Sequence, residues 1–192
     1  MLAQRYRDGV GVKQSDKKAI ELYEMAAKRG HASAQFNLGL FYYAGSHGLT
    51  QSFKSGIKYF TLAANQGHSM AQTNLGLMYA IGDGIEQSSK KAVELLEMAA
   101  KGGSATAQNN LGQYYSKGMH GLTQSPKRAF EYYVLAAAQG NADAQYNLGV
   151  FYCNGAGVEQ SYTKAREWLT KAAAQGEEHA IDALKQLDEL GV

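Results

Sequence analysis

One six-residue string occurs four times along the chain at nearly constant spacing, and this repetition restricts the possible folds more than any other feature. The string reads Ala-Gln, a variable residue, then Asn-Leu-Gly. It begins at Ala34, Ala71, Ala107 and Ala144, so the repeat length is 36 or 37 residues. Repeats of this length are units of supersecondary structure that bury their apolar surface by stacking on their neighbours. The chain is therefore expected to form a stacked array.

Within one repeat the apolar residues have the spacing of an α-helix. Ala34, Leu38 and Phe41 lie on one face of a first helix, which we call helix A. Gly45 follows that helix at the position where a left-handed residue commonly ends a helix. A serine then begins a second helix, helix B, because a serine hydroxyl caps the free N–H groups of a first turn. These serines are Ser15, Ser52, Ser88, Ser125 and Ser161.

Two further features support this assignment. Pro126, the only proline, directly follows Ser125, and the first turn of a helix is where proline is tolerated. A glycine also recurs inside helix A in four repeats, although it costs about 1 kcal/mol there relative to alanine. We therefore expect two helix backbones to approach closely at these glycines. They are Gly39, Gly76, Gly112 and Gly149.

These landmarks predict an all-α, right-handed superhelical solenoid of about eleven helices in stacked antiparallel pairs, forming a single domain over residues 1–192. The predicted repeats are 33–69, 70–105, 106–142 and 143–177, with a partial first repeat over 1–32 and a capping helix over 178–190. Because Leu2 aligns with Leu38, the chain begins inside a helix A. We therefore expect it to be a fragment of a longer array.

Composition argues against several classes of function. The net charge is +2 and no basic run exceeds two residues, whereas nucleic-acid binders carry clustered basic surfaces. No stretch of about 18 apolar residues is present, so no membrane insertion is expected. The first residues lack the apolar core of a signal peptide, and the single Cys153 forms no internal disulfide. We expect a monomeric cytoplasmic protein without a cofactor.

The repeat resembles the Sel1-like repeat, a relative of the tetratricopeptide repeat. The repeat that begins at Ala71 carries the pattern most fully. It shows Leu75-Gly76, Tyr79, Gly82, Gly84, Lys91-Ala92, Ala99-Ala100 and Gly103. Serine replaces the aspartate that this family commonly has at the cap, which is a chemically equivalent exchange. The resemblance covers essentially the whole chain.

This resemblance implies a curved array that gathers partner proteins, as adaptors do in protein degradation, cell-wall synthesis and bacterial signalling. An alternative comes from a cysteine-rich secreted branch of the family, whose members have been credited with binding or slowly hydrolysing β-lactams. That branch has a cysteine pair in each repeat. The single Cys153 departs from that pattern, so we expect a noncatalytic scaffold rather than an enzyme.

Two loops share the tetrapeptide His-Gly-Leu-Thr, which begins at His47 and at His120. One interpretation is a paired binding feature two repeats apart. The other is duplication of a two-repeat block that carried a neutral insertion, and we favour this second interpretation.

The polar residues do not form a recognisable metal site. His31 and His68 occupy one phase of the repeat, where Ser104 and Asn141 stand later. Serine and asparagine favour helix caps, so a capping or turn role is expected for all four. Ligands one repeat apart are also too distant to share a zinc ion, which needs contacts of about 2 Å. No metal is predicted.

The candidates for a nucleophile are equally explained by the repeat. Ser161 and Lys164 have the spacing of a Ser-x-x-Lys motif. The same spacing recurs at Ser15 and Lys18 and at Ser88 and Lys91. Because the motif belongs to the repeat, we assign it to the scaffold and predict no catalytic residue. Cys153 ends a helix A and is expected to be a half-buried apolar residue.

The predicted binding surface is the concave face, which the A helices line in stacked helix pairs. We expect a protein or peptide to contact the helix A side chains that lie beside the packing face. These are Phe36, Asn37, Leu40, Tyr43, Thr73, Asn74, Leu77, Asn109, Asn110, Gln113, Tyr146, Asn147 and Val150. Phe36, Leu40 and Tyr43 are too apolar for a solvated face and indicate an interaction site.

The asparagine that occurs in every copy of the string has two interpretations. These residues are Asn37, Asn74, Asn110 and Asn147. In related tetratricopeptide repeats an asparagine at this phase clamps a peptide backbone, because an amide both donates and accepts hydrogen bonds. Alternatively, each amide bonds to a neighbouring helix. The sequence does not decide between the two.

Overall fold

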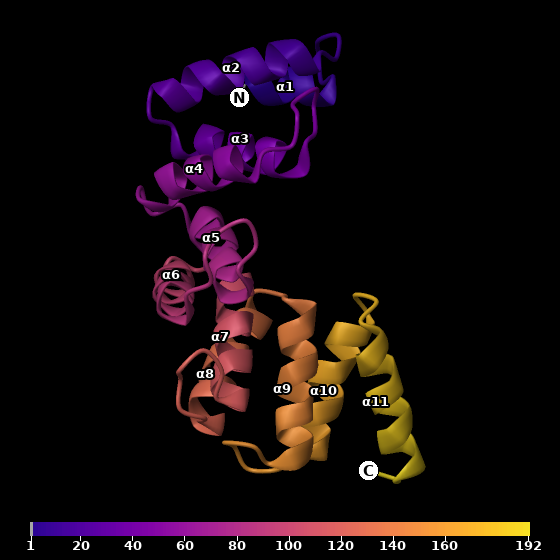
Figure 1. Ribbon diagram of the computed structural model, residues 1–192. Helices are drawn as coiled ribbons and strands as arrows, with labels where there is room; N and C mark the ends of the chain where they lie inside the picture. Colours follow the sequence, from indigo (N-terminus) through magenta and orange to yellow (C-terminus); the bar gives the residue numbers. More distant parts are fainter. Residues whose placement is uncertain (1) are drawn as a thin grey trace. The chain divides into compact units, whose positions relative to one another are not determined.

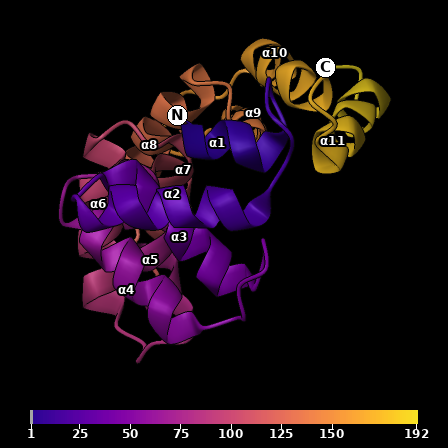
Figure 2. The same cartoon turned by 90° about the horizontal axis from the view of Figure 1, so that it is seen from above.

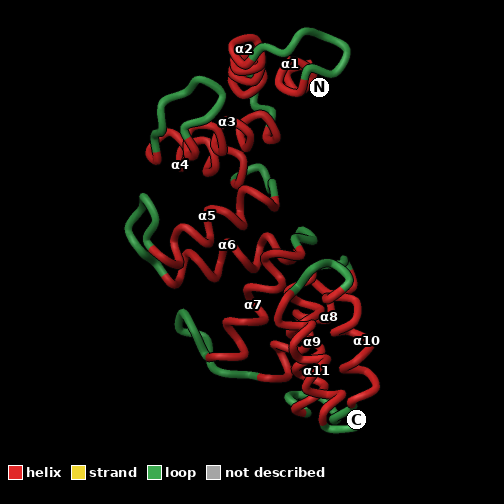
Figure 3. The backbone as a smooth tube through the Cα atoms, turned by 90° about the vertical axis from the view of Figure 1, so that its right-hand side faces the viewer, coloured by secondary structure: helices red, strands yellow, loops and turns green. Residues whose placement is uncertain are grey.

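The computed structural model describes residues 2–192, which form eleven helices and no strand (Figure 1, Figure 3). The helices are α1 (Leu2–Asp8), α2 (Asp16–Lys28), α3 (Ala32–Ala44), α4 (Phe53–Ala64), α5 (Ser69–Ile81), α6 (Ser89–Lys101), α7 (Ala105–Lys117), α8 (Pro126–Ala138), α9 (Ala142–Asn154), α10 (Tyr162–Ala173) and α11 (Glu178–Glu189). This confirms the predicted all-α class and the number of helices. Met1, where the predicted repeat 1–32 begins, lies outside the described residues.

The helices form two compact units, Met1–Gly102 and Gly103–Val192. In the first unit each helix from α1 to α6 packs against the next one along the chain. The second unit repeats this arrangement from α7 to α11, and Figure 2 shows α10 with α11 beside it. The odd-numbered helices carry the helix A sequences and the even-numbered helices carry the helix B sequences. None of the helices in residues 2–192 is long and apolar enough to cross a membrane.

Each helix pair is held by large side chains of helix B that are almost completely buried. They occupy one phase of the repeat: Tyr23, Phe60, Leu96, Tyr133 and Leu169. The leucine of the repeated string packs from helix A. These leucines are Leu38, Leu75, Leu111 and Leu148. Burial of side chains of this size contributes about 1.5–3 kcal/mol each, so the pairs are stabilised mainly by this apolar contact.

The helix A glycines are sites of close contact, but the predicted approach of two helix backbones is only partly correct, because at Gly39 and Gly112 the close neighbour is a helix B side chain. A Cβ atom placed on Gly112 would lie 2.6 Å from the ring of Tyr133. One on Gly76 would lie 3.0 Å from Cγ of Leu96 and 3.2 Å from the carbonyl oxygen of Ala92. The structure adds that the nearest atoms at Gly112 belong to a helix B side chain, not to its backbone. Helix A therefore needs glycine because a bulky neighbour fills the space of a side chain.

The predicted caps are also confirmed. The hydroxyls of the five serines each accept a hydrogen bond from the backbone N–H three residues later. They are Ser15, Ser52, Ser88, Ser125 and Ser161. Pro126 stands in the first turn of α8. Gly45 ends α3 in the left-handed region, with φ of 63°. These contacts satisfy backbone groups that a helix end otherwise leaves free.

A glutamine before each capping serine has a role that the sequence analysis did not assign. The side-chain amide of Gln124 donates to the carbonyl oxygen of Ser116, at 3.0 Å, near the end of α7. The equivalent residues Gln14, Gln51, Gln87 and Gln160 make the same kind of bond. The Gln-Ser dipeptide therefore caps the end of helix A and the start of helix B together.

The buried glutamine of the repeated string joins helices from different repeats. In α9, Gln145 Nε2 donates to the carbonyl oxygen of Ala137 in α8, at 3.3 Å. Its Oε1 accepts from Nε2 of Gln175, just beyond α10, at 2.8 Å. One side chain therefore bridges the C-terminal ends of two helices B. Gln72 donates to Ala64 and lacks the second partner, because Gly102 replaces that glutamine.

Replacing Gly76 with leucine is expected to lower the free energy of unfolding by about 1–3 kcal/mol, because the added atoms overlap Leu96 and Ala92. Urea unfolding followed by circular dichroism measures this value. Ala44→Leu adds the same side chain at an exposed position of α3 and serves as the control. Equal effects of the two substitutions would contradict the close contact.

Gln145→Met is expected to lower the free energy of unfolding by about 2 kcal/mol, because it removes two hydrogen bonds. Gln72→Met is expected to lower it by about 1 kcal/mol, because it removes one hydrogen bond. The same urea experiment compares them, with Gln186→Met on the exposed side of α11 as control. If Gln145→Met and Gln72→Met are indistinguishable, the second bond does not stabilise the stack.

Candidate functional site

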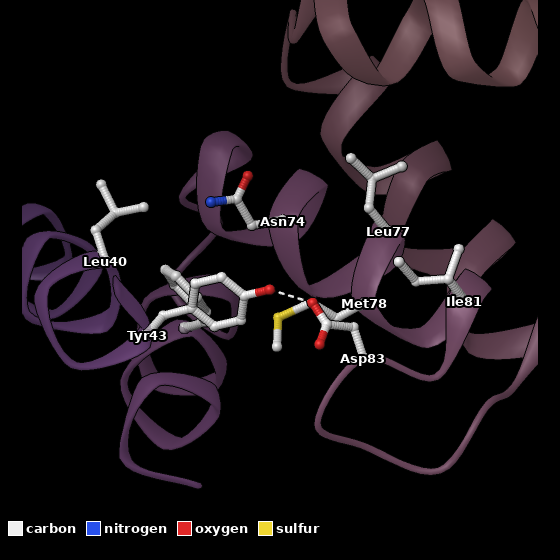
Figure 4. A pocket seen from close by; sticks show the side chains of 8 residues that line it. Leu40, Tyr43, Asn74, Leu77, Met78, Ile81 and Asp83 are labelled. Atoms are coloured by element: carbon white, nitrogen blue, oxygen red, sulfur yellow. Dashed lines mark hydrogen bonds between the residues drawn. The ribbon is translucent and has the colours of Figure 1, made fainter. Parts of the chain in front are cut away.

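A hollow lies on the first unit, where the A helices α3 and α5 meet the loop that follows α5. Its volume is about 260 Å³. The residues that line it are Leu40, Tyr43, Phe60, Asn74, Leu77, Met78, Ile81 and Asp83. Figure 4 shows Leu40 from α3 on one side and Leu77 and Ile81 from α5 on the other. The lining is therefore apolar apart from the Tyr43 hydroxyl, one amide and one carboxylate.

Tyr43 and Asp83 join the two sides of this hollow. The Tyr43 hydroxyl donates a hydrogen bond to Oδ2 of Asp83 (Figure 4). This bond to a carboxylate, together with burial, raises the pKa of Tyr43 above its usual value. The hydroxyl therefore remains a donor at neutral pH. Phe53 supports the Tyr43 ring edge-on, with ring centroids 5.2 Å apart.

Asp83 is positioned by the glycines on either side of it. Gly82 and Gly84 both have left-handed φ values, 77° and 68°, which glycine adopts without strain. The turn begins at the end of α5 and directs the carboxylate back to α3. Position 84 is also crowded by Phe53 of α4, since a Cβ there would lie 2.9 Å from Cβ of Phe53.

Four of the predicted contact residues come together at the hollow: Leu40, Tyr43, Asn74 and Leu77. In the second unit five others are partly exposed: Asn110, Gln113, Tyr146, Asn147 and Val150. All five lie on the A helices α7 and α9.

Three predicted contact residues are buried instead. Phe36, Thr73 and Asn109 are 6%, 3% and 4% exposed. Phe36 stacks on the ring of His68, with centroids 4.7 Å apart, and packs against Phe60. The expectation that Phe36 forms part of an exposed apolar surface is therefore wrong. Its side chain points toward the next helix pair and fills the space between repeats.

Two of the repeated asparagines bond within their own helices. Asn37 Nδ2 donates to the carbonyl oxygen of Ser33, at 2.7 Å. Asn110 Nδ2 donates to that of Thr106, at 2.8 Å. Neither interpretation of the sequence anticipated this bond, which occupies one donor of each amide.

The other two asparagines differ from each other. Asn147 of α9 donates to Oδ1 of Asn109 in α7, at 3.1 Å, so it braces neighbouring helices as one interpretation proposed. Asn74 makes no side-chain hydrogen bond to any part of the described chain, and it stands at the wall of the hollow (Figure 4). Its donor and acceptor groups are therefore available.

The sequence analysis missed Met78, Ile81 and Asp83. Ile81 is 74% exposed, although it is a large apolar residue. Other repeats place Ala44, Lys117 and Asn154 at its position, and they place Val10 and Ala156 where Asp83 stands. The signal that was available is this departure from the repeat, because residues required by the fold recur in every copy.

Comparison with known proteins identifies the repeat. Five consecutive segments match the Sel1 repeat: residues 1–31, 32–68, 69–104, 105–141 and 142–177. The chain belongs to the Sel1 repeat family. Members of this family are generally protein-interaction scaffolds and are typically noncatalytic. A search of curated proteins found no match.

Solved Sel1 structures share the fold over nearly the whole chain. A Sel1 repeat protein from Oxalobacter formigenes is 31% identical with a TM-score of 0.88, and the match covers 99% of this chain and 75% of that one. The protective antigen c5321 of uropathogenic Escherichia coli, described as an SLR fold, is 34% identical with a TM-score of 0.88, over 99% of this chain and 40% of that one. The predicted solenoid of stacked helix pairs is confirmed.

A cysteine-rich protein shares the fold at lower similarity. Helicobacter pylori cysteine rich protein B is 22% identical with a TM-score of 0.55, and the match covers 69% of this chain and 95% of that one. This likeness concerns the fold alone. The Sel1 chain described here has a single cysteine, Cys153.

The Ser-x-x-Lys spacing has a structural use in this Sel1 chain. The Ser161 hydroxyl accepts from the backbone N–H of Lys164, at 3.4 Å. The Lys164 ammonium lies 5.3 Å from the centre of the Tyr152 ring, a favourable contact of a cation with an aromatic face. Lys18 over Tyr6 and Lys91 over Tyr79 repeat it. The serine of the motif therefore caps helix B, and its lysine packs on an aromatic ring of helix A.

The histidines also contribute to the scaffold. His68 accepts from the backbone N–H of Ala71 as the cap of α5, whereas His31 makes no side-chain cap bond. The loop residues His47 and His120 cover the buried aromatic rings of Phe41 and Tyr114. Within residues 2–192, no three histidine, cysteine or acidic side chains gather where they could hold a metal ion.

Cys153 is expected to react slowly with thiol reagents, because burial raises the pKa of its thiol and only the thiolate is nucleophilic. Alkylation by iodoacetamide at pH 8 should be slower than that of free cysteine, and the midpoint of its rate against pH should lie above about 8.5. Urea-unfolded protein provides the control rate. Fast alkylation at pH 7 would instead indicate an activated nucleophile.

Proposed function

We propose that this Sel1 repeat chain is a noncatalytic scaffold that binds a protein or peptide on the face formed by its A helices. In the first unit the contact is centred on the hollow between α3 and α5. The observation that carries the proposal is the hollow itself, an apolar depression whose distinctive residues are not required by the repeat. Concave, largely apolar sites with a few polar groups are typical of ligand recognition.

Exposed apolar residues support this location. Ile81 is 74% exposed and Leu77 one turn earlier is half-buried. Met70, in the first turn of the same helix, is 59% exposed. Several large apolar side chains on one helix of a scaffold indicate a surface that a partner covers.

The Asn74 amide supports an extended peptide as the bound element. An amide offers both an acceptor and two donors, which match the N–H and C=O groups of a peptide backbone. Asn74 meets this requirement because its side chain has no partner within residues 2–192, whereas Asn37, Asn110 and Asn147 each use theirs. We therefore retain the clamp interpretation for Asn74.

The test begins with a partner captured from native extract on the purified protein and identified by mass spectrometry. Asn74→Ala and Ile81→Ser are each expected to weaken its binding by about 1–3 kcal/mol, because they remove a backbone contact and an apolar wall. Calorimetry measures the affinities, and circular dichroism confirms that each variant is folded.

Matched controls lie on the B helices. Asn65→Ala changes an exposed asparagine after α4, and Leu62→Ser changes an exposed apolar residue on α4; both should bind normally. Full binding by folded Asn74→Ala and Ile81→Ser would show that the hollow is not the site. Hydrolysis of nitrocefin above background would contradict the noncatalytic assignment.

A further inference from the structure

We propose that the hollow selects a peptide segment in which a large apolar side chain adjoins a lysine or arginine, so that the apolar group enters the hollow and the cation pairs with Asp83. This inference rests on the proposed function and adds the chemistry of the partner. Three observations carry it: the apolar walls, a carboxylate that has no cationic partner, and the free amide.

The walls define the first part of the partner. Leu40 approaches from α3 and Leu77 and Ile81 from α5, and Met78 and Phe60 complete the apolar lining. A volume of about 260 Å³ accommodates a single leucine or aromatic side chain and excludes a folded element. Transfer of such a side chain from water into apolar surroundings is favourable, and it needs no polar group in return.

The carboxylate of Asp83 defines the second part. It is partly buried, and its Oδ2 accepts only the neutral hydroxyl of Tyr43. No lysine, arginine or histidine in residues 2–192 forms an ion pair with it. Withdrawing a carboxylate from water without a countercharge is unfavourable. Covering the hollow with a peptide is therefore more favourable when a cation lies beside Asp83.

The charge pattern around the hollow makes this preference specific. The sequence contains no aspartate or glutamate from Met25 to Gly82, so α3, α4 and α5 contribute no acidic side chain. Asp83 is the one carboxylate of the lining. Repeats with the same compact loop have the neutral residues Val10 and Ala156 at its position. The preference for a cation therefore belongs to this repeat rather than to the fold.

Asn74 places the peptide backbone between these two contacts. It lines the same hollow from α5, one turn before Leu77 and Met78. Hydrogen bonding of the peptide backbone to the amide does not depend on the peptide sequence. Binding in the hollow and pairing with Asp83 do depend on it, because they involve peptide side chains. The hollow and Asp83 together recognise two neighbouring side chains of an extended segment.

The test uses the whole chain and four blocked six-residue peptides. Two contain the pair in either order, Ser-Gly-Leu-Arg-Gly-Ser and Ser-Gly-Arg-Leu-Gly-Ser. Their partners carry citrulline in place of arginine, which has nearly the same shape and no charge. With at least one order, the arginine peptide is expected to bind about fivefold more tightly than its citrulline partner, because only the cation pairs with the carboxylate.

Two matched variants locate the effect. Asp83→Asn keeps an oxygen that accepts the Tyr43 hydroxyl, and it should abolish the preference, so that the arginine and citrulline peptides bind with equal affinity. Glu86→Gln removes an exposed carboxylate three residues later and should retain the preference. Thermal unfolding confirms that both variants are folded.

Equal binding of the arginine and citrulline peptides, or loss of the preference in Glu86→Gln as much as in Asp83→Asn, would overturn the inference. The same holds if no peptide binds at millimolar concentration. The proposed function is judged separately, by the captured partner. If Ile81→Ser weakens that partner while the peptides show no charge preference, the hollow binds but does not select a cation.

Discussion

A large helix B side chain that occupies the space above a helix A glycine is the contact on which the rest of this structure depends. Tyr133 over Gly112 and Leu96 over Gly76 lock each pair at short range, since a buried ring leaves no room for a side chain opposite it. The Gln-Ser dipeptide then fixes the connection between the two helices by capping both. One face of helix A therefore packs against helix B. The opposite face keeps a fixed orientation relative to that helix B.

This division supports the proposed location of the binding site. The recurring glutamines and serines form caps and bridges, as Gln145 does between α8 and α10. Residues that differ between repeats do not form these recurring caps and bridges. Ile81 and Asp83 are such departures, and they lie together at one hollow. A repeated scaffold therefore presents its specific chemistry at positions where the copies differ.

The sequence predicted the local features well, because each depends on neighbouring residues. Ser125 and Pro126 located the start of α8, and the glycine in each string indicated the close approach. Contacts between distant residues were not predictable. Tyr43 and Asp83 are 40 positions apart, and no local pattern connects them.

Phe36 shows a further limit of the same kind. Helical periodicity placed it off the packing face of its own pair, but the next repeat covers it through His68. Burial between repeats depends on how far a side chain of the neighbouring repeat extends. The spacing of residues within one helix does not predict that distance.

Backbone amide shifts of nitrogen-labelled protein, recorded as the captured partner is added, test the central claim most directly. The account predicts that the perturbed amides cluster around Leu40, Asn74, Leu77, Ile81 and Asp83 on the A-helix side of the first unit. It also predicts little change at Met25, Leu62 and Met98, which are exposed apolar residues on the B helices. Perturbation centred on those B-helix residues, with the hollow unaffected, would contradict it.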